Sequence, residues 1–234
     1  MESKFTWSDF SQLLTAFGTL ALAILAIYGH KIRSWLMRPK LELSLKNEHP
    51  YLELIRQTSS DESSRCFQEM RVKVINNGNE TARNCKIIVD SIFLQRKNTT
   101  EFYKDKEFIP TELFWTSEKQ TKDILPKIPS YAIVARIDEK QNVGAQTNVS
   151  SGNNTEYSLY VWAEAYASKG KFHSIDKGHI VFPIVMYADN ISIPMKQFIE
   201  IFWEGSNPEK ITNANFDIKL LSIGEARKIL GRLI

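Results

Sequence analysis

The chain has 234 residues, of which 43% are hydrophobic, and its 30 basic and 27 acidic residues leave a formal net charge of +3. So small a net charge gives no support for a nucleic-acid partner. Two cysteines, Cys66 and Cys85, exclude a disulfide-dense secreted scaffold and fit a reducing compartment, although two cysteines can still form one bridge.

An uncharged apolar run, FSQLLTAFGTLALAILAIY, covers residues 10–28 and is long enough to cross the hydrocarbon core of a bilayer as a helix. A cleavable signal peptide is the alternative for an apolar run so close to the amino terminus. Three features oppose this alternative: acidic residues outnumber the lysine before the run, the run is longer than usual, and no small-x-small site follows it. We therefore predict a transmembrane helix at 10–28, preceded by a short extracytoplasmic segment at 1–9.

Basic residues follow the apolar run with no acidic residue among them, and such an excess marks the cytoplasmic end of a span. We expect residues 29–39 to continue as a basic juxtamembrane helix, which Pro39 ends. The cations can bind anionic lipid headgroups, or they are an ordinary stop-transfer flank. The predicted localisation is the inner (plasma) membrane, with the amino terminus outside and the carboxyl domain in the cytoplasm. The predicted anchors at the membrane flanks are Trp7, Lys31, Arg33, Trp35, Arg38 and Lys40.

Small side chains recur along the apolar run at spacings of four, four and three residues. They form a stripe along which a second helix can approach closely, which is typical of membrane helices that associate. The stripe predicts a homo-oligomer, but small residues are also common filler in membrane helices. Its members are Thr15, Thr19, Ala23 and Ala26.

Apolar and polar residues alternate through much of the region between residues 40 and 221, and helical periodicity is almost absent there. Many strands joined by turns rather than helices indicate an antiparallel fold. We predict a mainly β domain over 40–221, a β-sandwich of immunoglobulin-like general form. The expected strands are 40–45, 51–56, 68–75, 82–94, 112–115, 131–137, 157–166, 180–187, 191–203 and 216–221.

A β-hairpin is expected at the centre of residues 68–94. Met70, Val72 and Val74 alternate with charged residues and should point inward. Asn77-Gly78 follows, and this dipeptide is the strongest short-range hairpin signal because both residues accept positive φ. The sequence therefore predicts that strands 68–75 and 82–94 pair across this turn.

Two further segments stand out near the carboxyl end. Residues 138–156 form a long polar stretch, interpreted as a protruding loop, with a linker between two small domains as the alternative. Residues 222–234 show a capping-box pattern at Ser222 and Glu225, followed by apolar residues at helical spacing. An amphipathic helix this short is marginal alone, so we expect it to dock on its own domain or a neighbouring subunit, with the membrane surface or a partner as alternatives.

The sequence lacks the common catalytic, nucleotide and metal motifs. His173, Ser174 and Asp176 are the residue types of a hydrolase triad, but triads are assembled from distant parts of a chain. Two cysteines and two histidines would supply the four ligands that a zinc ion needs, yet they lack the paired spacing that is typical of zinc sites. We therefore predict no cofactor, no metal and no catalytic residue. The four candidate zinc ligands are Cys66, Cys85, His173 and His179.

Aromatic residues on one face of strand 157–166 are the best candidate binding surface, with one carboxylate among the rings as a polar anchor. A central strand covered on both faces is the structural alternative. The residues are Tyr160, Trp162, Glu164 and Tyr166.

The leading hypothesis from these patterns is a non-enzymatic binding or scaffolding module for a protein partner at the cytoplasmic membrane face. A second hypothesis is an oligomerising membrane sensor or effector of the stress or defence type, whose soluble domain controls packing of the transmembrane helices. A membrane-tethered enzyme is a third hypothesis, which only the size of the domain supports. The expected partners are the lipid bilayer, a protein and a second copy of the chain.

Overall fold

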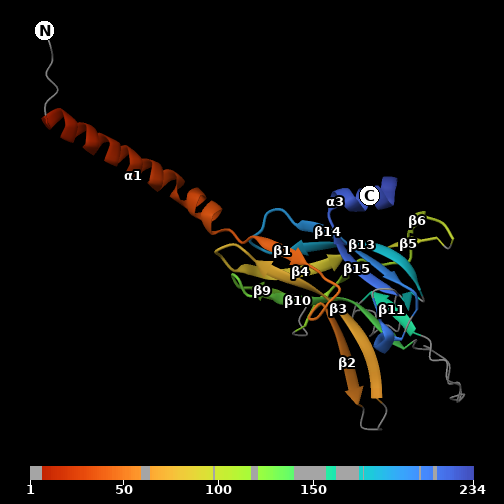
Figure 1. Ribbon diagram of the computed structural model, residues 1–234. Helices are drawn as coiled ribbons and strands as arrows, with labels where there is room; N and C mark the ends of the chain where they lie inside the picture. Colours follow the sequence, from red (N-terminus) through yellow and green to blue (C-terminus); the bar gives the residue numbers. More distant parts are fainter. Residues whose placement is uncertain are drawn as a thin grey trace, which may run out of the picture.

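The computed structural model is mainly β, with antiparallel sheets, an apolar helix at the amino terminus and a short helix at the carboxyl terminus (Figure 1). It describes residues 7–58, 64–96, 98–116, 121–139, 157–161, 174–175, 177–205, 207–212 and 215–234.

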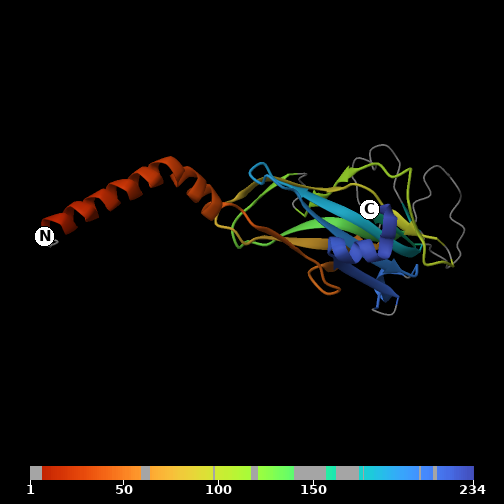
Figure 2. The same ribbon diagram turned by 90° about the horizontal axis from the view of Figure 1, so that it is seen from above.

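Helix α1 (Trp7–Met37) is one continuous helix, so the apolar run and the basic segment predicted after it form a single element. Its residues Phe10–Gly29 are long and apolar enough to span a membrane, and none of them is buried against the rest of the protein. The helix ends two residues before Pro39, where the restricted backbone ahead of a proline disfavours helix. In both views it projects from one end of the β domain, and Figure 2 shows that it bends along its length.

The described residues of the β domain form two antiparallel sheets. The first runs β1 (Leu41–Ser44), β3 (Ser64–Asn76), β10 (Ser130–Glu139), β11 (Tyr157–Val161) and β12 (Ser174–Ile175), with β2 (Leu52–Thr58) beside β3 and β8 (Phe114–Trp115) beside β10. The second runs β15 (Phe216–Leu221), β14 (Met195–Trp203), β13 (Gly178–Tyr187), β4 (Ala82–Val89) and β7 (Thr111–Glu112). Strand β5 (Phe93–Gln95) pairs with β13 and with β6 (Phe102–Lys104), and β9 (Lys122–Ile124) pairs with β4.

One cluster of buried side chains joins the two sheets into a single core. Met70, Val72 and Val74 of β3 are fully buried in it, as their alternation predicts. The second sheet contributes residues such as Ile87 and Ile184 to the same cluster. The side chains facing each other across the two sheets therefore define the interior of the domain.

The predicted hairpin across Asn77-Gly78 is wrong, although both of its strands exist. Strand β3 lies in the first sheet, where it pairs with β1, β2 and β10, whereas β4 lies in the second sheet and pairs with β13, β7 and β9. Leu41 of β1 takes the place opposite Asn76 at the end of β3. The chain therefore crosses from one sheet to the other at this turn, because the segment after α1 occupies the edge that the hairpin partner would need.

Helix α3 (Ile223–Leu230) begins with the predicted capping box: the Ser222 hydroxyl accepts a hydrogen bond from the Glu225 amide, and the Glu225 carboxylate accepts one from the Ser222 amide. The Ser222 hydroxyl also donates to the Glu225 carboxylate at 2.7 Å, and this bond, together with the one from the Ser222 amide, lowers the pKa of Glu225. Ala226 and Leu230 are buried in a second cluster, against Phe198 of β14 and other residues on the outer face of the second sheet. The helix thus docks on its own domain. Among the described residues, a 3₁₀ helix, η1 (Pro208–Lys210), lies between β14 and β15, and another, η2 (Gly231–Leu233), follows α3.

Candidate functional site

Three residues, Arg38, Pro39 and Lys40, join α1 to β1, and we call them the connector. Pro39 is buried. The fully buried side chain of Asn76 holds the next residue: its Oδ1 accepts hydrogen bonds from the Lys40 amide at 3.0 Å and from the Gly78 amide at 2.9 Å. Its Nδ2 donates to the carbonyl oxygens of Glu80 at 2.6 Å and Ile124 at 3.1 Å. One amide side chain thus ties together the connector, the β3–β4 turn and the end of β9.

Gly78 leaves no room for a side chain beside the connector. A Cβ built at this position would lie 2.4 Å from the Arg38 carbonyl oxygen, 2.6 Å from the Lys40 nitrogen and 2.7 Å from the Pro39 Cα. All three are backbone atoms, which cannot rotate away. Gly78 is therefore required by the close approach of two backbone segments rather than by a hairpin turn.

The loop after β9 adds further hydrogen bonds around the connector. We call Asn76, the β3–β4 turn and this loop, which together hold the connector, the clamp. The Lys127 amide donates to the Asn76 carbonyl at 2.9 Å and the Lys127 ammonium to the Asn77 carbonyl at 3.0 Å. The Asn77 amide in turn donates to the Lys40 carbonyl at 2.7 Å. Lys127 has a φ of 64°, a region that lysine rarely adopts, so its hydrogen bonds hold a strained backbone in place.

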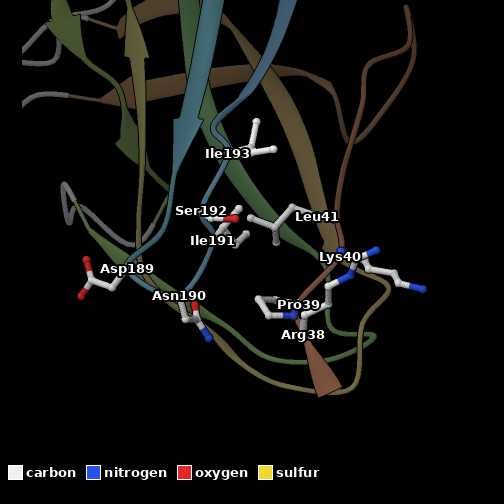
Figure 3. Close-up of a pocket in the computed structure, with 9 residues that line it drawn as sticks. All are labelled: Arg38, Pro39, Lys40, Leu41, Asp189, Asn190, Ile191, Ser192 and Ile193. Carbon is white, nitrogen blue, oxygen red and sulfur yellow. The ribbon is translucent and has the colours of Figure 1, made fainter. Parts of the chain in front are cut away.

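A pocket of about 780 Å³ opens between the connector and the loop that joins β13 to β14 (Figure 3). In the close-up, Leu41, Ile191 and Ser192 converge, whereas the carboxylate of Asp189 points away from them. The full lining is Arg38, Pro39, Lys40, Leu41, Asp189, Asn190, Ile191, Ser192 and Ile193.

The polar side chains of this loop fix its shape. The Asn190 Oδ1 accepts from the Arg83 amide at 3.1 Å, and its Nδ2 donates to the Thr81 carbonyl at 2.9 Å. Asp189 accepts from the Asn84 side chain at 2.6 Å. The pocket therefore offers aliphatic surface and the two connector cations to a ligand, and the lining contains no pair of groups suited to proton transfer.

The connector cations have no acidic partner in the described part of the chain. Arg38 and Lys40 are exposed, and no described carboxylate lies within 4.0 Å of either side chain. Cations without partners at the end of an apolar helix are the chemistry that binds phosphate or anionic headgroups.

Tyr160, the first residue of the predicted aromatic surface, is buried. It lies in β11 opposite Arg136 of β10. The other three residues of that surface, Trp162, Glu164 and Tyr166, lie outside the described residues. Tyr160 is therefore not exposed on a surface, and the predicted binding surface as a whole is untested.

Sequence reasoning missed a network of buried and partly buried charges on the face of the first sheet opposite the core. Arg71 of β3 forms ion pairs with Glu69, at 2.8 Å, and with Glu53 of β2. Next to them, Arg136 contacts Asp138 at 3.0 Å, and its guanidinium stacks 3.1 Å from the centre of the Phe67 ring. Burial raises the pKa of Glu69 and lowers that of Arg71. The sequence signal for this network is the set of charged residues that alternate with Met70, Val72 and Val74 along β3.

The small residues of α1 are exposed, as a packing stripe requires. The Thr15 hydroxyl donates to the Ser11 carbonyl and the Thr19 hydroxyl to the Thr15 carbonyl, each at 2.8 Å. Both hydroxyls are thus satisfied within the helix, and contact along Thr15, Thr19, Ala23 and Ala26 would depend on close packing. Among the flank anchors, Trp7 and Lys31 are exposed, and the side chains of Arg33 and Trp35 lie outside the described part.

Those candidate metal ligands and nucleophiles that the structure describes do not form a common site. Both cysteines are free, and burial raises the pKa of the Cys85 thiol to about 12. The His179 Nε2 lies 2.6 Å from the Glu200 Oε1. Among the described residues no three histidine, cysteine or acidic side chains lie close enough to hold a metal. His173 and Asp176 are outside the described residues.

Neither a protein-family model nor a curated protein sequence matches this chain.

Proposed function

We propose that this chain is a single-pass membrane protein whose β domain, a sandwich of immunoglobulin-like general form, is a non-enzymatic binding module for a protein partner at the cytoplasmic membrane face. The long apolar helix supports the anchor, and Lys31, Arg38 and Lys40 after it support the orientation. The clamp around the connector supports a scaffolding role, because it holds the domain at a defined place relative to the helix.

The observation that carries the binding proposal is the hairpin of β2 and β3, which projects from the rest of the β domain (Figure 1). In the described part of the chain, β2 pairs with a neighbour along one edge only, so the backbone groups of its other edge are available to an added strand. An ion pair at 3.1 Å between Arg56 and Glu209 ties the hairpin to η1. A braced strand with one open edge fits an extended segment of a partner.

Photo-crosslinking from the hairpin tests this proposal. A photoreactive amino acid replaces Leu54 of β2 in the full-length chain, and in a matched variant it replaces Tyr103 of β6; each side chain is 40% exposed. We expect one discrete adduct of defined mass from position 54 in cells, and none from position 103. No adduct at position 54, or the same adducts from both positions, would refute binding through this edge.

The second candidate function is an oligomerising membrane sensor or effector. The clamp favours it, because a domain locked to its helix can transmit a change in its position to helix packing. This function predicts ligand-dependent oligomers that are lost in a Thr19→Leu, Ala23→Leu double variant. An unchanging monomer in mild detergent would rule it out.

A further inference from the structure

We infer that the end of the β domain facing α1 is itself a membrane-contacting surface that fits the headgroup layer of an anionic bilayer. The surface consists of the 125–128 loop, the 188–193 loop and the connector. This inference rests on the proposed membrane anchoring of α1, and it goes further by giving the β domain its own contact with lipid.

Exposed aliphatic side chains gather at this end. Outside α1, the four most exposed large apolar side chains of the described residues are Ile193 at 79%, Ile109 at 59%, Ile128 at 52% and Leu125 at 49%. Of these, Ile109 lies between β6 and β7, and the other three belong to the two loops. Single exposed leucines and isoleucines are common, but three on two loops that both lie beside the connector point to a shared contact.

Both loops lie beside the connector. Ile193 lines the pocket together with Arg38 and Lys40 (Figure 3). Lys127, between Leu125 and Ile128, is hydrogen-bonded to the β3–β4 turn that encloses the connector. Figures 1 and 2 agree that this end of the domain faces α1.

The length of α1 brings this end close to the bilayer. Met37 is eight positions after Gly29, the last residue of the apolar span, and this length of helix rises by about 12 Å. The headgroup layer is about 5–7 Å thick on each side of the hydrocarbon core. The bend of α1 (Figure 2) shortens the distance between the connector and the membrane plane further. The rise of about 12 Å therefore exceeds the thickness of the headgroup layer by only about 5–7 Å, so side chains next to the connector lie close to the headgroups.

The charges at this end suit anionic lipid. Arg38 and Lys40 are exposed without an acidic partner among the described residues. Of the acidic side chains nearby, Glu80 is paired with Arg83 at 3.8 Å, and Asp189 and Glu42 accept hydrogen bonds from the Asn84 and Asn77 side chains. Cations around a patch of aliphatic side chains are the arrangement by which interfacial proteins bind anionic membranes.

Spin-label accessibility in lipid nanodiscs tests this inference on the full-length protein. The background variant is Cys66→Ser; Cys85 is kept, because its buried thiol with a pKa of about 12 does not react with the label. Single labels at Ile193→Cys and Ile128→Cys are compared with the exposed control Ile109→Cys. Discs of phosphatidylcholine with phosphatidylglycerol are probed with oxygen, which concentrates in lipid, and with a water-soluble nickel chelate.

We expect the ratio of oxygen to nickel collisions to be several-fold higher at positions 193 and 128 than at position 109. Equal ratios at all three positions would overturn the inference. Low collision rates with both reagents at position 193 would also overturn it, because they indicate protein contact, such as a second copy. A label at Leu20→Cys separates the two proposals: lipid exposure there with water exposure at 193 rejects only the loop contact, whereas water exposure at 20 rejects the membrane anchor.

Discussion

Asn76 shows how one side chain can organise a junction between elements. The amide is fully buried and uses both its donor and its acceptor atoms, bonding four backbone groups of the junction. A buried backbone group without a partner costs about 1–3 kcal/mol. Asparagine is the residue type that supplies two donors and an acceptor in so short a side chain.

Gly78 supplies the first prediction, at the scale of the residue. We expect Gly78→Ala to lower the free energy of unfolding of the β domain by about 1–3 kcal/mol, because the added methyl group meets only backbone atoms of the connector. Urea unfolding of the full chain in detergent, followed by tryptophan fluorescence, measures the change.

Gly224→Ala is the matched control for this substitution. A Cβ at position 224 meets nothing nearer than the Ser222 hydroxyl oxygen at 3.9 Å, and the residue is helical. The control should be neutral or stabilise the protein by up to about 1 kcal/mol. If the two variants unfold alike, the close packing of the β3–β4 turn on the connector is wrong.

Element packing is illustrated by α3, an eight-residue helix that depends on its contacts with the second sheet. We expect Leu230→Ala to destabilise the protein by about 2–3 kcal/mol, since its side chain is buried against the outer face of that sheet. The same measurement on Leu233→Ala, three residues further and exposed, should change by less than about 0.5 kcal/mol. A Leu230→Ala variant as stable as the parent would show that α3 does not hold this position in solution.

The sheets show that the local sequence can determine where a strand forms and which of its faces is buried, but not which strand it pairs with. The alternation in residues 68–75 predicted a strand with Met70, Val72 and Val74 inside, and this is confirmed. The partner of that strand was predicted wrongly, because Asn-Gly permits a hairpin turn without enforcing one. β1 pairs with the end of β3, and that competition is decided by residues far apart in the chain.

Orientation is the prediction at the scale of the whole molecule. The exposed cations that follow the apolar span favour a cytoplasmic β domain. A carboxyl-terminal reporter active only in the cytoplasm should therefore be active, and protease should cleave the domain in opened cells but not in intact ones. Cleavage in intact cells would place the domain outside and reverse the proposed orientation, so that the search for a partner would move to the cell surface.

The candidate site was only partly predictable. Arg38 and Lys40 were predicted to be membrane-flank cations from their position after the apolar run, and this role stays a prediction. Their association with the 188–193 loop could not be foreseen, since about 150 residues separate the two segments and no local pattern links them. Tyr160 was expected on a binding face and is instead buried, because neighbouring segments rather than strand periodicity decide whether the second face of a strand is covered.

The sequence by itself determined the features that depend on neighbouring residues: a helix apolar enough to span a membrane, its end before Pro39, the inward face of β3 and the capping box of α3. Periodicity, capping and proline restriction act within a few residues, so they can be read along the chain. Tertiary structure decided which strands pair, where Asn76 and Gly78 enclose the connector, and that three distant segments meet at the end facing α1. These outcomes depend on which of several compatible edges and faces buries the most apolar surface and satisfies the most backbone groups, and that competition involves the whole chain.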